Sequence, residues 1–142
     1  MPLSLPDTNI LLTYVRQSAL SAWIEARYAL TTTNPTPIVS VVSEGELRSL
    51  ARQLVWGSDK TRRMQDLLNL FPIVPLPYDG IVDAYAEIDD YSRRQGIATG
   101  KNDVWIAATA HVAGARLLTT DRDFDHLDGG FLQRDWIDPA TV

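Results

Sequence analysis

Short apolar runs alternate with segments of helical periodicity along this chain, and this alternation restricts the possible folds more than any other feature. The first run, bounded by Pro2 and Pro6, is typical of a first or edge strand. Pro75 interrupts the third run, which indicates an edge or irregular strand. The runs expected to form strands are residues 3–5, 38–42, 73–76, 117–120 and 136–137. Because strand–helix alternation implies a parallel sheet covered on both faces, the predicted fold is a three-layer α/β/α sandwich with a central, mainly parallel sheet.

Four segments between these runs place apolar residues three and four positions apart, which is the spacing of one helix face. Gly57, Gly96 and Gly114 lie at positions where the C-terminal caps of helices are expected. The helix before Phe71 is expected to begin at Ser58 or Asp59. The four apolar faces consist of Leu20, Trp23, Ile24 and Tyr28; Leu47, Leu50, Ala51, Leu54 and Val55; Met64, Leu67, Leu68 and Phe71; and Ile81, Tyr85, Ile88 and Tyr91.

The length of 142 residues is close to that of one domain, and 45% hydrophobic residues suffice for a sizeable core. We therefore expect a single domain over residues 1–142. The chain has no cysteine, so any bound metal must be held by oxygen or imidazole ligands. The amino end lacks a basic region followed by a long apolar run, and no apolar stretch reaches the roughly 18 residues of a membrane span. A soluble, cytoplasmic protein is expected.

The net charge is −5, with 18 acidic residues against 13 lysines and arginines, which argues against coating nucleic acid through bulk charge. Local cations remain available to a partner. These lysines and arginines form two clusters, and one further lysine lies two residues before Asp103. Such charged clusters are usually solvated helix faces. The cations are Lys60, Arg62 and Arg63; Arg93 and Arg94; and Lys101.

Four acidic residues lie where an apolar strand-like or helix-like stretch gives way to a turn or a helix start. They are Asp7, Glu46, Asp103 and Asp121. In open α/β folds, ligands bind beyond the carboxyl ends of the strands, and three of the four acids lie at or near such ends or at the opening of a following helix. Carboxylates gathered at one place bind metal ions that prefer oxygen. The four positions together therefore predict a metal site.

Each acid also has a structural interpretation. Asp7 is suited to be the N-cap of the next helix, and spacing alone does not separate that role from a ligand. Ser43 and Glu46 have the spacing of a capping box, in which Glu46 would bond to the backbone, and spacing alone favours this reading. Asp103 opens a helix too apolar to be exposed, where Asn102 is the better cap, so desolvation would be costly without a cation.

The last acid belongs to a series of alternating aspartates, Asp121, Asp123 and Asp125, that invites comparison with a calcium loop. The comparison fails, since the glycine expected after the third acid is missing and Leu132 occupies the place of the closing glutamate. Asp121 instead lies at the carboxyl end of a strand.

Taken together, these stretches resemble the PIN domain, and more closely the PIN-domain ribonucleases that form the toxin half of VapBC-type toxin–antitoxin pairs. The order and spacing match over nearly the whole chain. Pro6 and Pro75 depart from the family pattern, but neither is a ligand position. The matching segments are Asp7-Thr-Asn-Ile-Leu, Ser43-Glu-Gly-Glu-Leu, Asn102-Asp-Val-Trp-Ile-Ala-Ala-Thr-Ala and Leu118-Thr-Thr-Asp-Arg-Asp-Phe.

The resemblance implies a catalytic quartet that binds Mg²⁺ or Mn²⁺, made of Asp7, Glu46, Asp103 and Asp121. It selects Glu46 over Glu44 and reverses the interpretation based on spacing. The resemblance further implies that the quartet is supported by Asn9, Thr120 and Asp123. The implied function is a metal-dependent endoribonuclease that cleaves RNA phosphodiester bonds with metal-activated water.

The resemblance also implies a cognate antitoxin protein and a homodimer built from the early helices. Candidate contact residues are Tyr14, Trp23, Tyr28, Leu54 and Trp56, each of which could equally belong to the core. The two histidines, His111 and His126, are expected to be structural, because neither lies in a metal-binding or catalytic pattern.

Three other classes of protein fit these residues less well. A haloacid-dehalogenase-like phosphatase needs a second aspartate two residues after the first, where this chain has Asn9. A response-regulator receiver needs an acidic pair near the first strand, which is not evident. A PIN-like binding module with weak or no catalysis is the remaining alternative, and the intact quartet argues against it.

Overall fold

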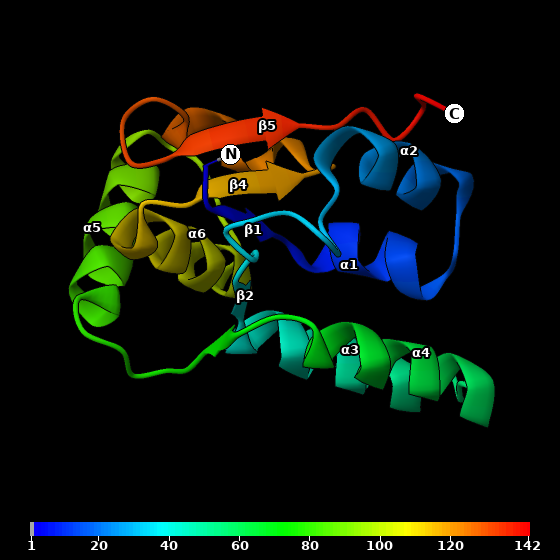
Figure 1. The fold of residues 1–142 in the computed structure, drawn as a ribbon. Helices are drawn as coiled ribbons and strands as arrows, with labels where there is room; N and C mark the ends of the chain where they lie inside the picture. Colours follow the sequence, from blue (N-terminus) through cyan, green and yellow to red (C-terminus); the bar gives the residue numbers. More distant parts are fainter. Residues whose placement is uncertain (1) are drawn as a thin grey trace.

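The computed structural model describes residues 2–142, and its elements follow the expected strand–helix alternation (Figure 1). The strands are short and the helices provide most of the secondary structure. In chain order the elements are β1 (Ser4–Pro6), α1 (Thr8–Val15), α2 (Ala19–Tyr28), β2 (Val39–Ser40), α3 (Val41–Gln53), α4 (Ser58–Asn69), β3 (Ile73–Val74), α5 (Ile81–Arg94), α6 (Lys101–Ala113), β4 (Arg116–Thr119), the 3-10 helix η1 (Arg122–Leu127) and β5 (Gln133–Trp136).

Every strand pair is parallel. One sheet has the order β1-β4-β5, and β2 pairs with β3 beside it. A backbone hydrogen bond from Ile38 N to Ser4 O, of 3.0 Å, joins the second pair to β1. The strands therefore lie in the spatial order β3-β2-β1-β4-β5, so that β1 is the first strand and an inner one, whereas β3 lies at an edge. This arrangement brings the carboxyl ends of β1 and β4 side by side.

Three clusters of buried side chains hold the layers together. Helices α5 and α6 pack on one face through a cluster that includes Leu5 and Leu117 of the sheet. Helices α1 and α2 cover the other face around Leu118 and Ile137. A third cluster joins α1, α3 and α4 to Val39 of β2. The result confirms the predicted α/β/α sandwich with a parallel sheet (Figure 1).

The strands are confirmed in place but differ at their ends. The run at 38–42 forms only two strand residues, because α3 already begins at Val41. Pro75 ends β3 at Val74, in agreement with an edge position. Pro6 is the last residue of β1, opposite Leu118, and the next amide, Asp7 N, still donates to Leu118 O at 2.9 Å. The departure at Pro6 therefore leaves the backbone pairing intact.

Several predicted helix ends need correction. Ser40, not Ser43, is the N-cap of α3, so Ser43 lies inside the first turn and the capping box with Glu46 is wrong. Asn102 is also not a cap, because α6 begins one residue earlier, after Gly100. Gly57 precedes α4 as its N-cap and does not end α3. Gly96 and Gly114 do adopt the left-handed conformation expected after α5 and α6, with φ of 71° and 62°.

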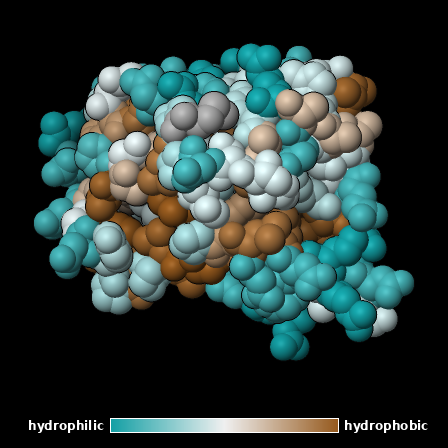
Figure 2. All heavy atoms as spheres, in the orientation of Figure 1, coloured by the Kyte–Doolittle hydropathy of each residue, from teal (hydrophilic) through white to brown (hydrophobic). Residues whose placement is uncertain are grey.

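The far ends of α3 and α4 project from the body at the lower right of Figure 1, and the same region is hydrophilic in Figure 2. The predicted apolar face of α3 is buried only in its first half. Leu47 is fully buried, whereas Leu54 and Val55 are 54% and 84% exposed. Within residues 2–142, every helix is too short or too polar to span a bilayer.

Candidate metal centre

A small polar cavity at the carboxyl edge of the sheet unites all four predicted acids. Its volume is about 190 Å³. The acids reach it from four elements: Asp7 follows β1, Glu46 lies on α3, Asp103 on α6, and Asp121 between β4 and η1. The lining residues are Asp7, Thr8, Asn9, Glu46, Asp103, Ile106 and Asp121. Parallel strands end at the same sheet edge, which is why residues far apart in sequence meet here.

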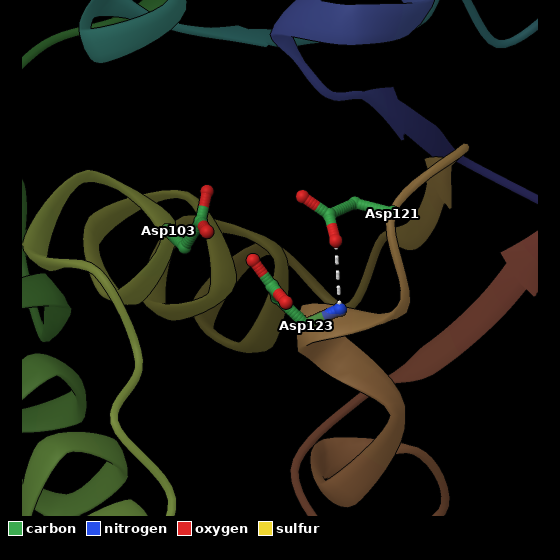
Figure 3. Close-up of side chains that lie close together, drawn as sticks. All are labelled: Asp103, Asp121 and Asp123. Carbon is green, nitrogen blue, oxygen red and sulfur yellow. Dashed lines mark hydrogen bonds between the residues drawn. The ribbon is translucent and has the colours of Figure 1, made fainter.

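Three carboxylates come closest together, and one of them is a predicted supporting residue. Asp103, Asp121 and Asp123 each place a carboxylate oxygen within 4.8 Å of the other two. Asp103 lies in the first turn of α6 and faces Asp121, the N-cap of η1, and Asp123 within η1 (Figure 3). Asp121 accepts a hydrogen bond from Asp123 N at 2.9 Å, which fixes the start of η1. The geometry is suited to shared coordination of one cation by carboxylate oxygens.

Asp7 is both a helix cap and a member of the cavity lining. One carboxylate oxygen accepts from Ile10 N at 3.0 Å and so caps α1. The other accepts from Thr119 Oγ1 at 2.5 Å. The side chain is only 4% exposed, and burial raises its pKa to about 6 despite these hydrogen bonds. The two interpretations of Asp7 are therefore compatible, because each oxygen has a different partner.

Glu46 is held from two sides. Thr8 Oγ1 donates to one of its carboxylate oxygens at 2.6 Å, and Asn102 Nδ2 donates to the other at 3.3 Å. Its carboxylate therefore joins α1, α3 and α6 at the cavity. Glu44, two residues earlier, instead forms an ion pair with Arg48 at 2.8 Å and does not line the cavity.

The carboxylates of the site repel one another. The pKa of Asp103 is raised to about 7, first by burial and then by the charges of Asp121, Asp123, Asp7 and Glu46. The pKa of Asp123 is also raised, by desolvation and by Asp121. Clustered, partly desolvated carboxylates are unfavourable unless a cation or protons neutralise them. This donor set fits a hard divalent ion such as Mg²⁺ or Mn²⁺.

Some contacts of the site could not be read from the sequence. Thr8 and Asn102 orient Glu46, and Thr119 bonds to Asp7 and also accepts from Asp121 N at 2.9 Å. The predicted supporting residue Thr120 lies next to Thr119, and its carbonyl accepts from Trp136 Nε1. Asn9 lines the cavity. In the parallel pair of β1 and β4, Pro6 lies opposite Leu118, so the next residues, Asp7 and Thr119, lie side by side. Knowledge of this strand register would have been enough to identify Thr119.

Sequence comparison gives the class of the protein. The PIN domain profile matches residues 4–130, which is most of the chain. The chain therefore belongs to the PIN domain family. No curated protein matches the sequence at a significant level.

Solved structures with the same fold include a member of the VapBC family of toxin–antitoxin systems from Mycobacterium tuberculosis. A chain of VapBC2 from Rickettsia felis, bound to a DNA fragment from their promoter, is similar with a TM-score of 0.81 and 19% identity, over 96% of this chain and 99% of that chain. VapBC-1 from nontypeable Haemophilus influenzae is similar with a TM-score of 0.77 and 23% identity, over 94% of this chain and 97% of that chain. FitAcB from Neisseria gonorrhoeae is similar with a TM-score of 0.73 and 24% identity, over 93% of this chain and 96% of that chain. At these identities the likeness establishes the shared fold.

Proposed function

We propose that this protein is a Mg²⁺- or Mn²⁺-dependent endoribonuclease and the toxin of a VapBC-type pair. The observation that carries the proposal is the convergence of Asp7, Glu46, Asp103 and Asp121 on one cavity at the carboxyl edge of the sheet. Membership of the PIN domain family supports the nuclease, and the VapBC structures of similar fold support the toxin.

In this proposal Asp103, Asp121 and Asp123 hold the ion, together with Asp7 and Glu46 across the cavity. Bound there, one or two such ions would activate the attacking water and stabilise the attacking and leaving oxygens of the phosphodiester. The surrounding residues orient the carboxylates. Thr119 holds Asp7, Thr8 and Asn102 hold Glu46, and the start of η1 places Asp123 beside Asp121.

No histidine competes for the role of general base. His111 bonds to Phe131 O at 2.5 Å, and His126 bonds to Ser92 Oγ at 2.8 Å. Among residues 2–142, neither imidazole lines the carboxylate cavity. With an ion bound, the site carboxylates would accept the proton of the attacking water, as in metal-assisted hydrolysis.

The toxin assignment adds partners. A small antitoxin would cover the active-site edge, and the protein would act in the cytoplasm as a homodimer. Of the candidate contact residues, Leu54 is exposed, whereas Tyr14, Trp23, Tyr28 and Trp56 are partly buried against the cores of their own chain. Leu54 is therefore the candidate that retains most free apolar surface.

The proposal is tested by incubating the purified protein, freed of any bound partner, with structured and unstructured RNAs. Mg²⁺ or Mn²⁺ should support cleavage, and EDTA should abolish it. Asp121→Asn serves as the inactive control, because it removes a cavity carboxylate and keeps a side-chain acceptor for Asp123 N.

Two results would contradict the proposal. Cleavage that continues undiminished in EDTA would exclude the metal mechanism. Absence of cleavage with every RNA and metal, in a protein that still binds Mn²⁺, would favour the alternative of a PIN-like binding module.

A further inference from the structure

A groove along α3 leads directly away from the carboxylate cavity. Its volume is about 550 Å³. Glu46 lines both the groove and the cavity, and Asn102, which bonds to Glu46, lies at the shared boundary. The full lining is Val42, Gly45, Glu46, Ser49, Leu50, Gln53 and Asn102. The groove is therefore continuous with the proposed cleavage site.

Six of the lining residues form one stripe on α3. They recur at intervals of three and four residues, so they share one side of the helix. From Val42 to Gln53 the stripe is about 17 Å long at the helical rise of 1.5 Å per residue. Such a length accommodates an extended chain segment, and the volume of the groove exceeds that of the cavity at its end.

Gly45 keeps the groove open next to the cavity. A Cβ added to Gly45 would meet no atom within 4 Å. Glycine in a helix interior costs roughly 0.5–1 kcal/mol relative to alanine, and no positive φ requires it here. At this position the glycine leaves the groove beside Glu46 free of a side chain.

The polar groups that line the groove, together with the cations that flank it, match a nucleic-acid strand. Ser49, Gln53 and Asn102 offer hydroxyl and amide groups, and Val42 and Leu50 offer apolar surface. Arg52 lies three residues after Ser49 and so flanks the stripe, and Lys101 precedes Asn102. Both cations are exposed, and neither forms a salt bridge with another residue of the described chain. Unpaired cations beside a polar groove favour a phosphate backbone.

We infer that the α3 groove is the track for single-stranded RNA on one side of the scissile bond. Gly45 opens it, Arg52 and Lys101 contact phosphates, and Ser49, Gln53 and Asn102 bond to sugar and base groups. The inference rests on the proposed ribonuclease function and adds the path of the substrate. A protein segment is the less suitable occupant, because the groove has only two apolar side chains to anchor it.

Blocking the groove tests the inference. Gly45→Gln adds a side chain above the helix without a clash and with better helix propensity. It should weaken binding of a fluorescein-labelled single-stranded RNA about tenfold or more, the scale of losing one base contact. Anisotropy would be measured in Ca²⁺ under conditions in which gels show intact RNA. Gly45→Ala is the matched control and should bind nearly as well as wild type.

Charge removal provides a second, independent variant set. Arg52→Gln and Lys101→Gln should each lower the slope of log affinity against log salt by about 0.7, the value for one phosphate contact of a single strand. Arg27→Gln on α2 removes an exposed charge that does not line the groove, and it should leave the slope unchanged.

The outcomes separate the groove from the active site. Mn²⁺ affinity, measured by calorimetry, should be the same in wild type and Gly45→Gln. Unchanged RNA affinity in both Gly45→Gln and Arg52→Gln would overturn the track. Normal RNA affinity with loss of inhibition by the cognate antitoxin would assign the groove to that protein and would also overturn it. A wild type that binds RNA but never cleaves it would refute the proposed function and leave the track standing.

Discussion

At the scale of single residues, Glu44 and Glu46 differ only in where the helix directs them. Glu46 accepts from Thr8 and Asn102 at the cavity, whereas Glu44 pairs with Arg48 on the surface. We expect Glu46→Gln to lower RNA cleavage about 100-fold or more, because it removes an anionic metal-site oxygen.

Glu44→Gln is the matched control for this experiment. It removes an exposed i,i+4 ion pair worth about 0.3–0.5 kcal/mol and should leave cleavage unchanged. Cleavage would be compared at saturating Mg²⁺, together with thermal melts. Equal losses in the two variants, or full activity in Glu46→Gln, would remove Glu46 from the site.

Asp103 contributes to how the stability of the metal-free protein responds to pH. Its pKa is raised from 3.8 to about 7, so the folded state binds a proton that the unfolded state releases. The contribution of Asp103 to the free energy of unfolding is therefore fully present below about pH 4, where the side chain is protonated in both states. It is lost as the pH rises through about 7, because the folded state must then hold the charged carboxylate. Asp103→Asn should be more stable than wild type in EDTA by about 0.5–2 kcal/mol at pH 8. The gain should shrink toward pH 4, as measured by denaturant titration at both pH values.

The same variant separates a metal ligand from a structural residue. Saturating Mn²⁺ should raise the melting temperature of wild type, since a ligand at 100 times its Kd adds about 2.7 kcal/mol. The increase should be much smaller in Asp103→Asn. If the variant is destabilised in EDTA at pH 8 and still gains the full Mn²⁺ shift, Asp103 serves only to start α6.

At the scale of elements, the end of α3 contains an unusual residue. Val55 follows the C-cap Leu54 with φ of 50°, although β-branched residues avoid the left-handed region. We expect Val55→Gly to raise the free energy of unfolding by roughly 0.5–1 kcal/mol, because only the conformational strain is removed at an 84% exposed site.

Val82 is the matched control for Val55. It is 56% exposed but lies in the regular α5 helix, so Val82→Gly should destabilise by a few tenths of a kcal/mol to about 1 kcal/mol. The two changes in unfolding free energy, measured by urea titration, should therefore have opposite signs. The same sign for both would mean that the left-handed conformation at Val55 carries no cost.

At the scale of the whole molecule, the proposed metal would join elements that are distant in sequence. The cavity receives residues from the start of α1, the middle of α3, the start of α6 and the start of η1. Mn²⁺ should therefore slow amide hydrogen exchange in these four segments together, because one bound ion stabilises their shared arrangement.

The far helices supply the internal control for the exchange experiment. Residues of α2 and α4 do not line the cavity, so their protection should change less than that of the four segments. The measurement compares apo and Mn²⁺-loaded protein by mass spectrometry. Protection confined to η1 would restrict the ion to the Asp121–Asp123 segment and exclude Asp7 and Glu46 from its coordination.

The amino-acid sequence predicted the alternation of elements, the parallel three-layer fold and the placement of acids at strand ends, because local periodicity and strand polarity suffice for these. It misplaced the start of α3, where Ser40 and Ser43 are both competent caps and both are buried. In the structure Ser40 accepts from Val42 N and caps the helix, whereas Ser43 accepts from Thr8 Oγ1. Tertiary structure alone decided which neighbours orient the carboxylates. Register set Thr119 and not Thr120 against Asp7, and helix packing brought Thr8 and Asn102 to Glu46. Such contacts depend on rotations and registers shared by segments up to 112 residues apart, to which no local pattern refers.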